Sequence, residues 1–336
     1  CKQYTPHLKV EFLDPQIDRV RLEGLKITHA STQGTIVIQC GTRQKVITLI
    51  GASPRLEERD FTNGLINVVR DAQPKVCFLT GHGERNTDDT NEKTGGSALK
   101  QLLEGESYTV DRTAIMITRP EVPADCDILV INGMGLTGPQ ADLHPEEIKA
   151  IQAYLDRGGR LLVLLDPWRK SVTSATQTEQ LLPWLRQKYG VVVGDDIVVS
   201  PTSKWAAEFS PDTSLFPVTQ GAKDFHGSYN QTHRITQGSD QKMLFSAGRS
   251  VGLANPMPGG VVGVPLLRTT PDFYGETDLA TLLSEGKAIK SAEEVSGPLP
   301  MAVAITAKTD FVVGDSGQTR DARIVVLIPL RFRDSA

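Results

Sequence analysis

The sequence lacks several features that would assign it to a functional class at once. No stretch approaches the roughly 18 consecutive apolar residues of a membrane-spanning helix. Basic residues are not in excess, since the formal net charge is −4, and this argues against a protein that binds nucleic acid. Only four cysteines occur, and no two have the C-x-x-C spacing of a zinc or thioredoxin-type redox site. We therefore expect no metal and no cofactor.

The remaining composition is that of an ordinary globular chain. Hydrophobic residues make up 39% and charged residues 23% of the 336 residues, enough for a large core and for more than one domain. The chain begins at Cys1 with neither a methionine nor a signal peptide. We therefore expect a trimmed or processed product, with any membrane anchor lying outside these residues.

The N-terminal part is predicted to be a small α/β segment, residues 1–52. Short runs rich in β-branched residues predict strands at 8–12, 35–39 and 44–49. Residues 57–70 then carry apolar side chains at the spacing of one helical face.

From residue 53 to residue 336 we predict a larger α/β domain. Continuous apolar runs alternate with helical patterns, which indicates a doubly wound, mostly parallel sheet. The predicted strands are KVCFLT (75–80), DILVING (127–133), RLLVLLDP (160–167) and the region 191–199. Three helices are predicted between these strands. The first follows an N-cap at Ser97, the second starts near Pro145, and the third covers residues 179–189.

The clearest helix is HPEEIKAIQAYLDRGG. Pro145 lies near its first position, and Glu146 and Glu147 lie at the positive end of the helix dipole. Asp142 and His144 precede it, where capping is the expected role.

Beyond about residue 200 the pattern loosens. Pro, Ser, Thr and Gly dominate 201–260, and strands are predicted only for VVGVPLLRT, MAVAITA and ARIVVLI. These strands either complete the sheet or cap it.

Three of the predicted parallel strands end in polar or glycine-rich residues. The carboxyl ends of parallel strands share one edge of a sheet, and ligands bind there at the switch in strand order. We expect this edge to bind a ligand or a partner protein. The residues concerned are Gly81, His82, Gly83, Glu84, Asn132, Gly133 and Asp166.

Several kinds of chemistry fit His82, Glu84 and Asp166. The turn around His82 has no nucleophile elbow of the G-x-S-x-G type, and Cys77 lies four residues too early on a strand where it should face the core. Neither a Walker A loop nor an HExxH motif occurs. The residues alone leave three roles open: a turn held by local hydrogen bonds, a ligand or partner contact, and catalysis.

Several stretches carry a resemblance to a known family: VCFLTGHGE, ALKQLLEGESYTV, ADCDILVINGM, IKAIQAYLDRGGRLLVLLDP and WLRQKYGVVVGDDIVV. They resemble the auxiliary component of an uncharacterised ABC-type transport system, the GldG-like family named for gliding motility. The core of that family is similar to a domain of an intraflagellar transport protein. VEFLDPQ at 10–16 and VPLLRTTPDFYGETDL at 264–279 extend the resemblance to nearly the whole chain.

The resemblance implies an extracytoplasmic α/β domain similar to a class I glutamine-amidotransferase fold without its nucleophile. It also implies a membrane tether, and a permease and an ATPase as partners. We therefore predict a non-enzymatic accessory or binding subunit at the periplasmic face of the inner membrane, with a small-molecule or peptide ligand. The alternative is a hydrolase or amidotransferase-like enzyme that uses His82, Glu84 and Asp166. A scaffold that binds only protein is a third hypothesis.

Overall fold

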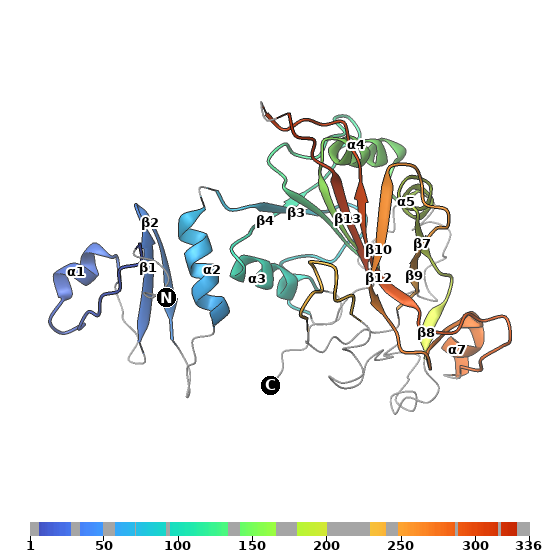
Figure 1. Cartoon of the computed structure of the whole chain (residues 1–336), viewed down its shortest axis with the longest axis horizontal. Helices are drawn as coiled ribbons and strands as arrows, with labels where there is room; N and C mark the ends of the chain where they lie inside the picture. The colour runs from blue at the N-terminus through green and yellow to red at the C-terminus, as the bar shows by residue number, and fades with distance from the viewer. Residues whose placement is uncertain are drawn as a thin grey trace. The chain divides into compact units, whose positions relative to one another are not determined.

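The computed structural model divides into two compact units (Figure 1). The first comprises Cys1–Gln73 with Gly105–Ser107, and the second comprises Pro74–Glu104 with Tyr108–Ala336. The predicted boundary between residues 52 and 53 lies outside the described residues. The residues that the structure describes are 7–27, 34–49, 58–70, 72–91, 95–133, 142–165, 180–199, 229–239, 248–285, 288–314 and 317–327.

The smaller unit contains an antiparallel hairpin against which one helix packs. A Cβ atom on Gly64 of this helix would lie 2.5 Å from Ile38 Cδ1 in the hairpin, so a larger residue at this position would displace the end of the Ile38 side chain. The elements of this unit are α1 (Arg19–Gly24), β1 (Thr35–Cys40), β2 (Arg43–Thr48) and α2 (Glu58–Val69).

Most of the elements predicted for this unit are confirmed. Strands were expected at 35–39 and 44–49, and a helix at 57–70, where β1, β2 and α2 lie. The strand predicted for 8–12 is wrong, because these residues carry no regular secondary structure. The side chain of Phe12 is 95% exposed, and no described strand pairs with this segment to supply the hydrogen bonds that a sheet requires.

The larger unit is built on a seven-stranded, mostly parallel sheet, as predicted. The strand order is β10-β12-β13-β6-β5-β3-β4, and every neighbouring pair from β13 to β4 is parallel. The pairs β10–β12 and β12–β13 are antiparallel. The strands are β3 (Lys75–Leu79), β4 (Thr109–Thr113), β5 (Ile128–Asn132), β6 (Arg160–Leu164), β10 (Val261–Arg268), β12 (Pro300–Ala307) and β13 (Ala322–Leu327).

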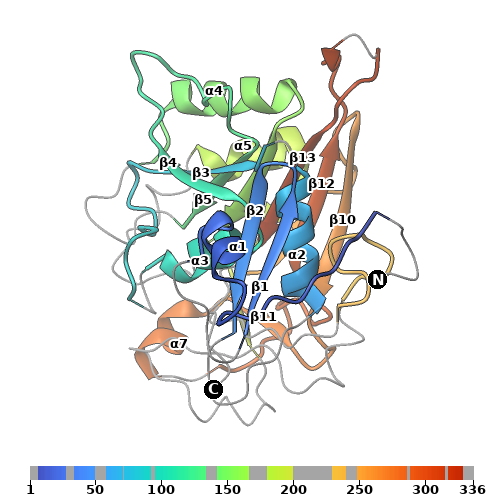
Figure 2. The ribbon, with the colours of Figure 1, turned by 90° about the vertical axis from the view of Figure 1, so that its left-hand side faces the viewer.

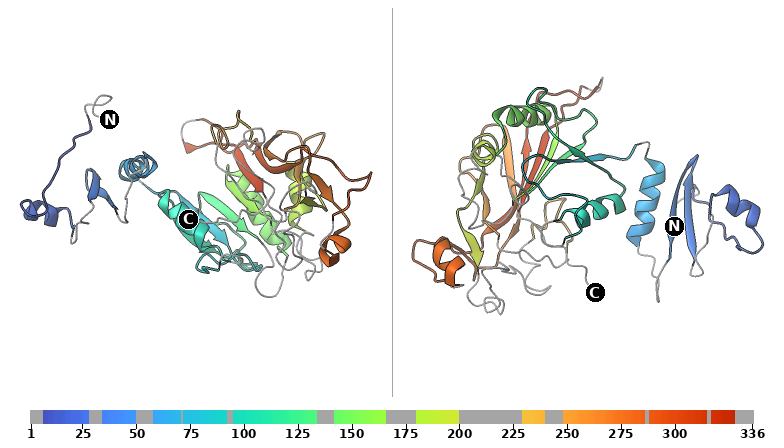
Figure 3. Two further views of the ribbon diagram at one scale, coloured as in Figure 1. Left: turned by 90° about the horizontal axis from the view of Figure 1, so that it is seen from below. Right: turned by 180° about the vertical axis from the view of Figure 1, so that it is seen from behind.

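Helices flank this sheet on both faces (Figure 2, Figure 3). Alternate residues of β3 and β5 point to opposite faces, and the apolar set on one face packs against α3 while the other packs against α4 and α5. On the α3 side the buried residues are Val76, Phe78 and Val130, in contact with Leu99 and Leu103 of the helix. The helices of this unit are α3 (Ser97–Gly105), α4 (Pro145–Asp156), α5 (Leu181–Tyr189) and α7 (Leu279–Glu285).

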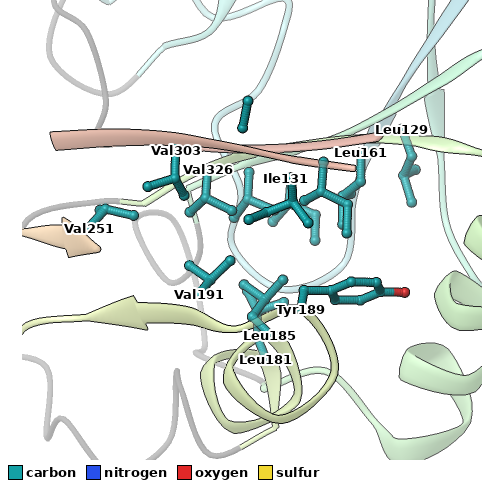
Figure 4. Close-up of a cluster of buried hydrophobic side chains, with 14 of the residues drawn as sticks. Leu129, Ile131, Leu161, Leu181, Leu185, Tyr189, Val191, Val251, Val303 and Val326 are labelled. Carbon is teal, nitrogen blue, oxygen red and sulfur yellow. The ribbon is translucent and has the colours of Figure 1, made fainter. Parts of the chain in front are cut away.

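The main hydrophobic core lies between the sheet and α5. Figure 4 shows the apolar face of α5 directed at side chains from β5, β6, β12 and β13, and burial of this apolar area is the principal stabilising contribution. The labelled residues are Leu129, Ile131, Leu161, Leu181, Leu185, Tyr189, Val191, Val251, Val303 and Val326.

The described part of the C-terminal half completes the sheet rather than capping it. β13 adds next to β6 in parallel, and β12 and β10 extend the sheet further by antiparallel pairing. Two small antiparallel pairs accompany it. They are β7 (Val191–Val193) with β9 (Val251–Leu253), and β8 (Ile197–Val199) with β11 (Tyr274–Glu276).

The strand order reverses direction at β3. The chain runs from β3 through α3 to β4 on one side, and then returns to place β5 on the other side of β3. Such a reversal leaves a crevice beyond the carboxyl ends of the two central strands, which is where doubly wound sheets bind ligands. Both β3 and β5 end in residues that the sequence marks as candidates.

Candidate functional site

The GHGE turn, residues 81–84, follows directly after β3. The backbone N–H of Thr80 donates to Thr113 O (2.9 Å) and so continues the pairing of β3 with β4. Gly81 and Gly83 then adopt φ angles of 127° and 74°, in the region that favours glycine. The two glycines thus let the chain reverse tightly enough for His82 and Glu84 to meet.

His82 lies between two carboxylates. Its Nδ1 lies 3.0 Å from Glu84 Oε1, and its Nε2 lies 3.0 Å from Glu147 Oε2. The backbone N–H of His82 also donates to Glu84 Oε2 at 2.7 Å. All three residues are buried, with exposed fractions of 6%, 7% and 5%. We call these three residues the His82 cluster.

Glu147 reaches the cluster from the first turn of α4. His144 is the N-cap of this helix, and Glu147 Oε2 accepts its backbone N–H at 2.7 Å, while the His144 side chain accepts from Glu146 N. This reciprocal capping box, with Pro145 at the start of the helix, confirms the predicted capping role of His144. The same Glu147 oxygen therefore caps α4 and binds the imidazole of His82.

The electrostatics of the cluster favour a charged imidazole. Burial is the largest single influence and on its own would lower the pKa of His82. The hydrogen bond and charge of Glu84, together with those of Glu147, outweigh burial, so the pKa of His82 is raised above its ordinary value of 6.5. A protonated ring donates from both nitrogens, and each donation here is to a carboxylate.

Asn132 and Gly133 lie beside the turn, at the end of β5. The backbone N–H of Arg85 donates to Asn132 O (3.0 Å), which joins the GHGE segment to the neighbouring strand end. Gly133 has a φ of 70° and its N–H donates to Leu164 O at the end of β6. The side chain of Asn132 is buried, with a residue exposure of 4%.

The structure thus brings most of the predicted residues to one edge. The ends of β3, β5 and β6 are neighbours, and His82, Glu84 and Asn132 lie close together, whereas Asp166 lies outside the described residues. Glu147 was not predicted as a partner of His82. The segment HPEE was predicted to start a helix, and Glu147 is its fourth residue. The only sequence signal for the contact is that this helix follows a strand that ends at the same edge as β3.

The arrangement is not that of a hydrolytic triad. In such a triad one nitrogen of the histidine faces the nucleophile and the other faces a carboxylate. Here both ring nitrogens face carboxylates, and Cys77 lies in the core, as expected, in the same buried cluster as Cys126. The cluster can hold a proton and fix α4 to the turn, but His82 has no open nitrogen with which to activate a nucleophile.

Within the described ranges, no group of three or more His, Cys, Asp or Glu side chains is arranged to hold a metal ion. No described helix is long and apolar enough to cross a bilayer.

Comparison with solved structures returns distant likenesses. The mmIFT52 N-terminal domain is 18% identical, with a TM-score of 0.42 over 75% of this chain and 84% of that one. A putative ThuA-like protein from Bacteroides uniformis is 12% identical, with a TM-score of 0.36 over 77% and 82%. A cold-adapted β-galactosidase from Rahnella sp. R3 is 13% identical, with a TM-score of 0.30 over 76% of this chain and 40% of the enzyme. At TM-scores below 0.5 none of these likenesses supports a statement about fold or function.

The family comparison is more decisive. No curated protein matches the chain. The family described as ABC-type uncharacterized transport system matches residues 73–327, which is most of the sequence and contains the GHGE turn, Asn132 and the start of α4. The chain belongs to this family, as an auxiliary component of an ABC-type transport system.

Proposed function

We propose that this chain is a non-enzymatic, extracytoplasmic accessory or binding subunit of an ABC transporter. Its partners would be the permease and the ATPase, and segments outside this chain would hold it at the periplasmic face of the inner membrane. Membership of the transport-system family supports the association with a transporter. The edge that carries the GHGE turn and Asn132 would then recognise a ligand or a partner.

The observation that carries the non-enzymatic role is the double engagement of His82. A general base must present an open nitrogen to the group that it deprotonates. Both nitrogens of His82 are 3.0 Å from carboxylate oxygens inside a buried cluster, and one of these oxygens also caps α4. A reaction at His82 would require α4 to separate from the turn.

The competing proposal is a hydrolase or amidotransferase-like enzyme that uses His82, Glu84 and Asp166. We propose in addition that the fold is related to class I glutamine amidotransferases without their nucleophile, which such an enzyme would need and an accessory subunit would not. We expect the purified chain to hydrolyse glutamine, p-nitrophenyl acetate and casein no faster than buffer. Turnover above that background that disappears in His82→Ala, while His233→Ala retains it, would establish the enzyme instead.

The extracytoplasmic location can be tested with a cysteine that the chain already has. Cys40 is exposed, whereas Cys77 and Cys126 are buried. In cells whose outer envelope has been removed but whose inner membrane is sealed, a membrane-impermeant maleimide should modify the Cys40 peptide, as mass spectrometry would show. Cys40→Ser is the control for the assignment of the label. Modification only after the inner membrane is broken would place the chain in the cytoplasm.

A further inference from the structure

The start of α3 carries backbone N–H groups that donate to no acceptor in the part of the chain that the structure describes. Gly96 is the N-cap, since its carbonyl oxygen accepts from Lys100 N (3.2 Å), and not Ser97 as the sequence suggested. The N–H groups of Gly96 and Ser97 donate to loop carbonyl oxygens at 2.8 and 3.2 Å. The next two, of Ala98 and Leu99, donate to no described residue. These N–H groups form the positive end of the helix dipole.

The side chain of Asn132 lies against the same helix start. Asn132 is 4% exposed, and no hydrogen bond joins its side chain to another described residue. A Cβ atom on Gly96 would lie 3.1 Å from Asn132 Nδ2, so the amide is directed at the N-cap and glycine leaves room for it. The amide atoms of Asn132 are not among the fully enclosed side-chain atoms of the described residues, so they can be reached from outside. The NH₂ group of this amide can therefore donate to a ligand at the helix start.

The position in the fold gives an independent reason to expect a ligand here. Asn132 ends β5, α3 follows β3, and the strand order reverses between these two strands. Ligands of doubly wound sheets bind in the crevice at such a reversal. The His82 cluster leads away to α4, which packs on the opposite face of the sheet from α3. The donors at the start of α3 are therefore separate from the interactions that occupy His82.

The local charges indicate what kind of ligand fits. Helix N-termini bind anions, because the free N–H groups and the dipole both favour negative charge. Two basic residues lie near this helix start: Lys100, which is paired with Asp88 at 2.8 Å, and Arg85, whose backbone N–H donates to Asn132 O. A group with one negative charge and two acceptor oxygens suits this site better than a phosphate dianion.

We propose that the start of α3 and the side chain of Asn132 form a binding site for a carboxylate group. One carboxylate oxygen accepts from the N–H groups of Ala98 and Leu99, and the other accepts from Asn132 Nδ2. The site deepens the proposed function, on which it rests, because it specifies the ligand chemistry of a binding subunit.

Nuclear magnetic resonance on the whole chain, labelled with ¹⁵N in alanine, leucine and asparagine, tests the site. Sodium acetate is titrated against sodium chloride at constant pH and ionic strength. The backbone signals of Ala98 and Leu99 and the side-chain NH₂ of Asn132 should shift and saturate, with a dissociation constant on the order of 10 mM, typical of a few hydrogen bonds. N-Acetyl-dialanine distinguishes a peptide chain end from a small carboxylate: tighter binding than acetate assigns the site to chain ends.

The variants separate this site from a general effect of charge. Asn132→Asp places a like charge opposite the ligand and should weaken acetate binding at least tenfold. Gln101→Glu adds the same charge to an exposed position of α3 and should leave binding within about twofold. Should Asn132→Asp fail to fold, Asn132→Ala replaces it. Asn132→Ala should also lose the saturable response. Its melting temperature should fall only by the amount expected for a small cavity, because the amide of Asn132 forms no hydrogen bond with another described residue.

Three results would overturn the proposal. They are shifts that acetate and chloride produce alike, saturable shifts that survive in Asn132→Asp and Asn132→Ala, and tighter binding of inorganic phosphate than of acetate. None of these three results would bear on the non-enzymatic role, which is tested by the hydrolysis assays and by their dependence on His82. A failure of the carboxylate site is thus distinguishable from a failure of the proposed function.

Discussion

Two buried polar clusters of the larger unit hold their carboxylates in different ways. In the His82 cluster an imidazole lies between Glu84 and Glu147, and positive charge compensates negative charge. In the second, which we call the Glu276 cluster, Tyr274, Glu276 and Glu294 lie together, and within the described residues no basic side chain forms an ion pair with either carboxylate. The only described cation beside the cluster is Lys290, whose Nζ lies 5.8 Å from the centre of the Tyr274 ring. Glu276 is 1% exposed and accepts from Tyr274 Oη at 3.2 Å.

The Glu276 cluster is stabilised by backbone donors, and its two carboxyl groups differ in their affinity for a proton. Glu276 accepts the N–H groups of Asp278 and Ile289 at 2.8 and 3.1 Å, and Glu294 accepts those of Thr277 and Ser291 at 2.8 and 2.7 Å. Burial, followed by the hydrogen bond to Glu294, raises the pKa of Glu276. Burial opposes ionisation of Glu294 as well, but its hydrogen bonds to the N–H groups outweigh this and lower its pKa. Glu276 therefore binds a proton more strongly than Glu294 does.

The comparison shows two solutions to the same problem. Two carboxylates cannot both be buried as anions without compensation, because desolvation opposes the charged form of each. The His82 cluster meets this with a third side chain and so joins segments 65 residues apart in the chain. The Glu276 cluster meets it with backbone N–H donors and with a raised pKa of Glu276, and it holds together only a local loop. Removal of one member should therefore have unequal consequences in the two clusters.

The largest effect is expected for His82→Ala. This change leaves Glu84 and Glu147 buried and facing an empty space, and loss of one partner from a buried ion pair costs about 3 kcal/mol or more of unfolding free energy. Because the pKa of His82 is raised in the folded state, its stabilisation is fully present below about pH 6.5 and is lost as the pH rises through the folded value. Urea denaturation at a series of pH values should show a destabilisation that is greatest at the acidic end of the range 6–9.

The matched control for this experiment is His233→Ala. The side chain of His233 accepts one hydrogen bond, from Ile235 N in a surface loop, so its loss should cost about 1 kcal/mol or less. A destabilisation by His82→Ala no larger than this, or one that grows as the pH rises, would show that His82 is held in the neutral form.

Much of the frame around these clusters follows from local sequence. The continuous apolar runs of β3, β5 and β6 predict buried parallel strands, and parallel strands must place their carboxyl ends on one edge. Proline and two glutamates after His144 predict the start of α4, and the structure confirms it. Local patterns were sufficient here because strand burial and helix capping depend on neighbouring residues.

The contacts within the clusters could not be predicted in this way. The bond from Glu147 to His82 depends on how α4 packs on the sheet, which no spacing within HPEE records. Glutamates in a polar segment are expected to be exposed to solvent, yet the fold of the loop buries Glu276 and Glu294. The failed strand at 8–12 has the same origin, since a strand requires a partner that its own sequence does not supply.

The smallest effect is expected for Glu276→Gln. The amide resembles the protonated carboxyl in shape and carries a donor toward Glu294, so the unfolding free energy at pH 7 should change by less than about 1 kcal/mol. The raised pKa of Glu276 means that its contribution is present at low pH and is lost as the pH rises through the folded value, and an amide does not titrate. Glutamine should therefore become more favourable relative to glutamate as the pH increases.

The same substitution in the other cluster, Glu84→Gln, removes a charge that the imidazolium requires and should cost about 2 kcal/mol. Urea denaturation of both variants side by side measures the difference, and equal losses would mean that Glu276 is ionised and that the two clusters do not differ in the way their charges indicate.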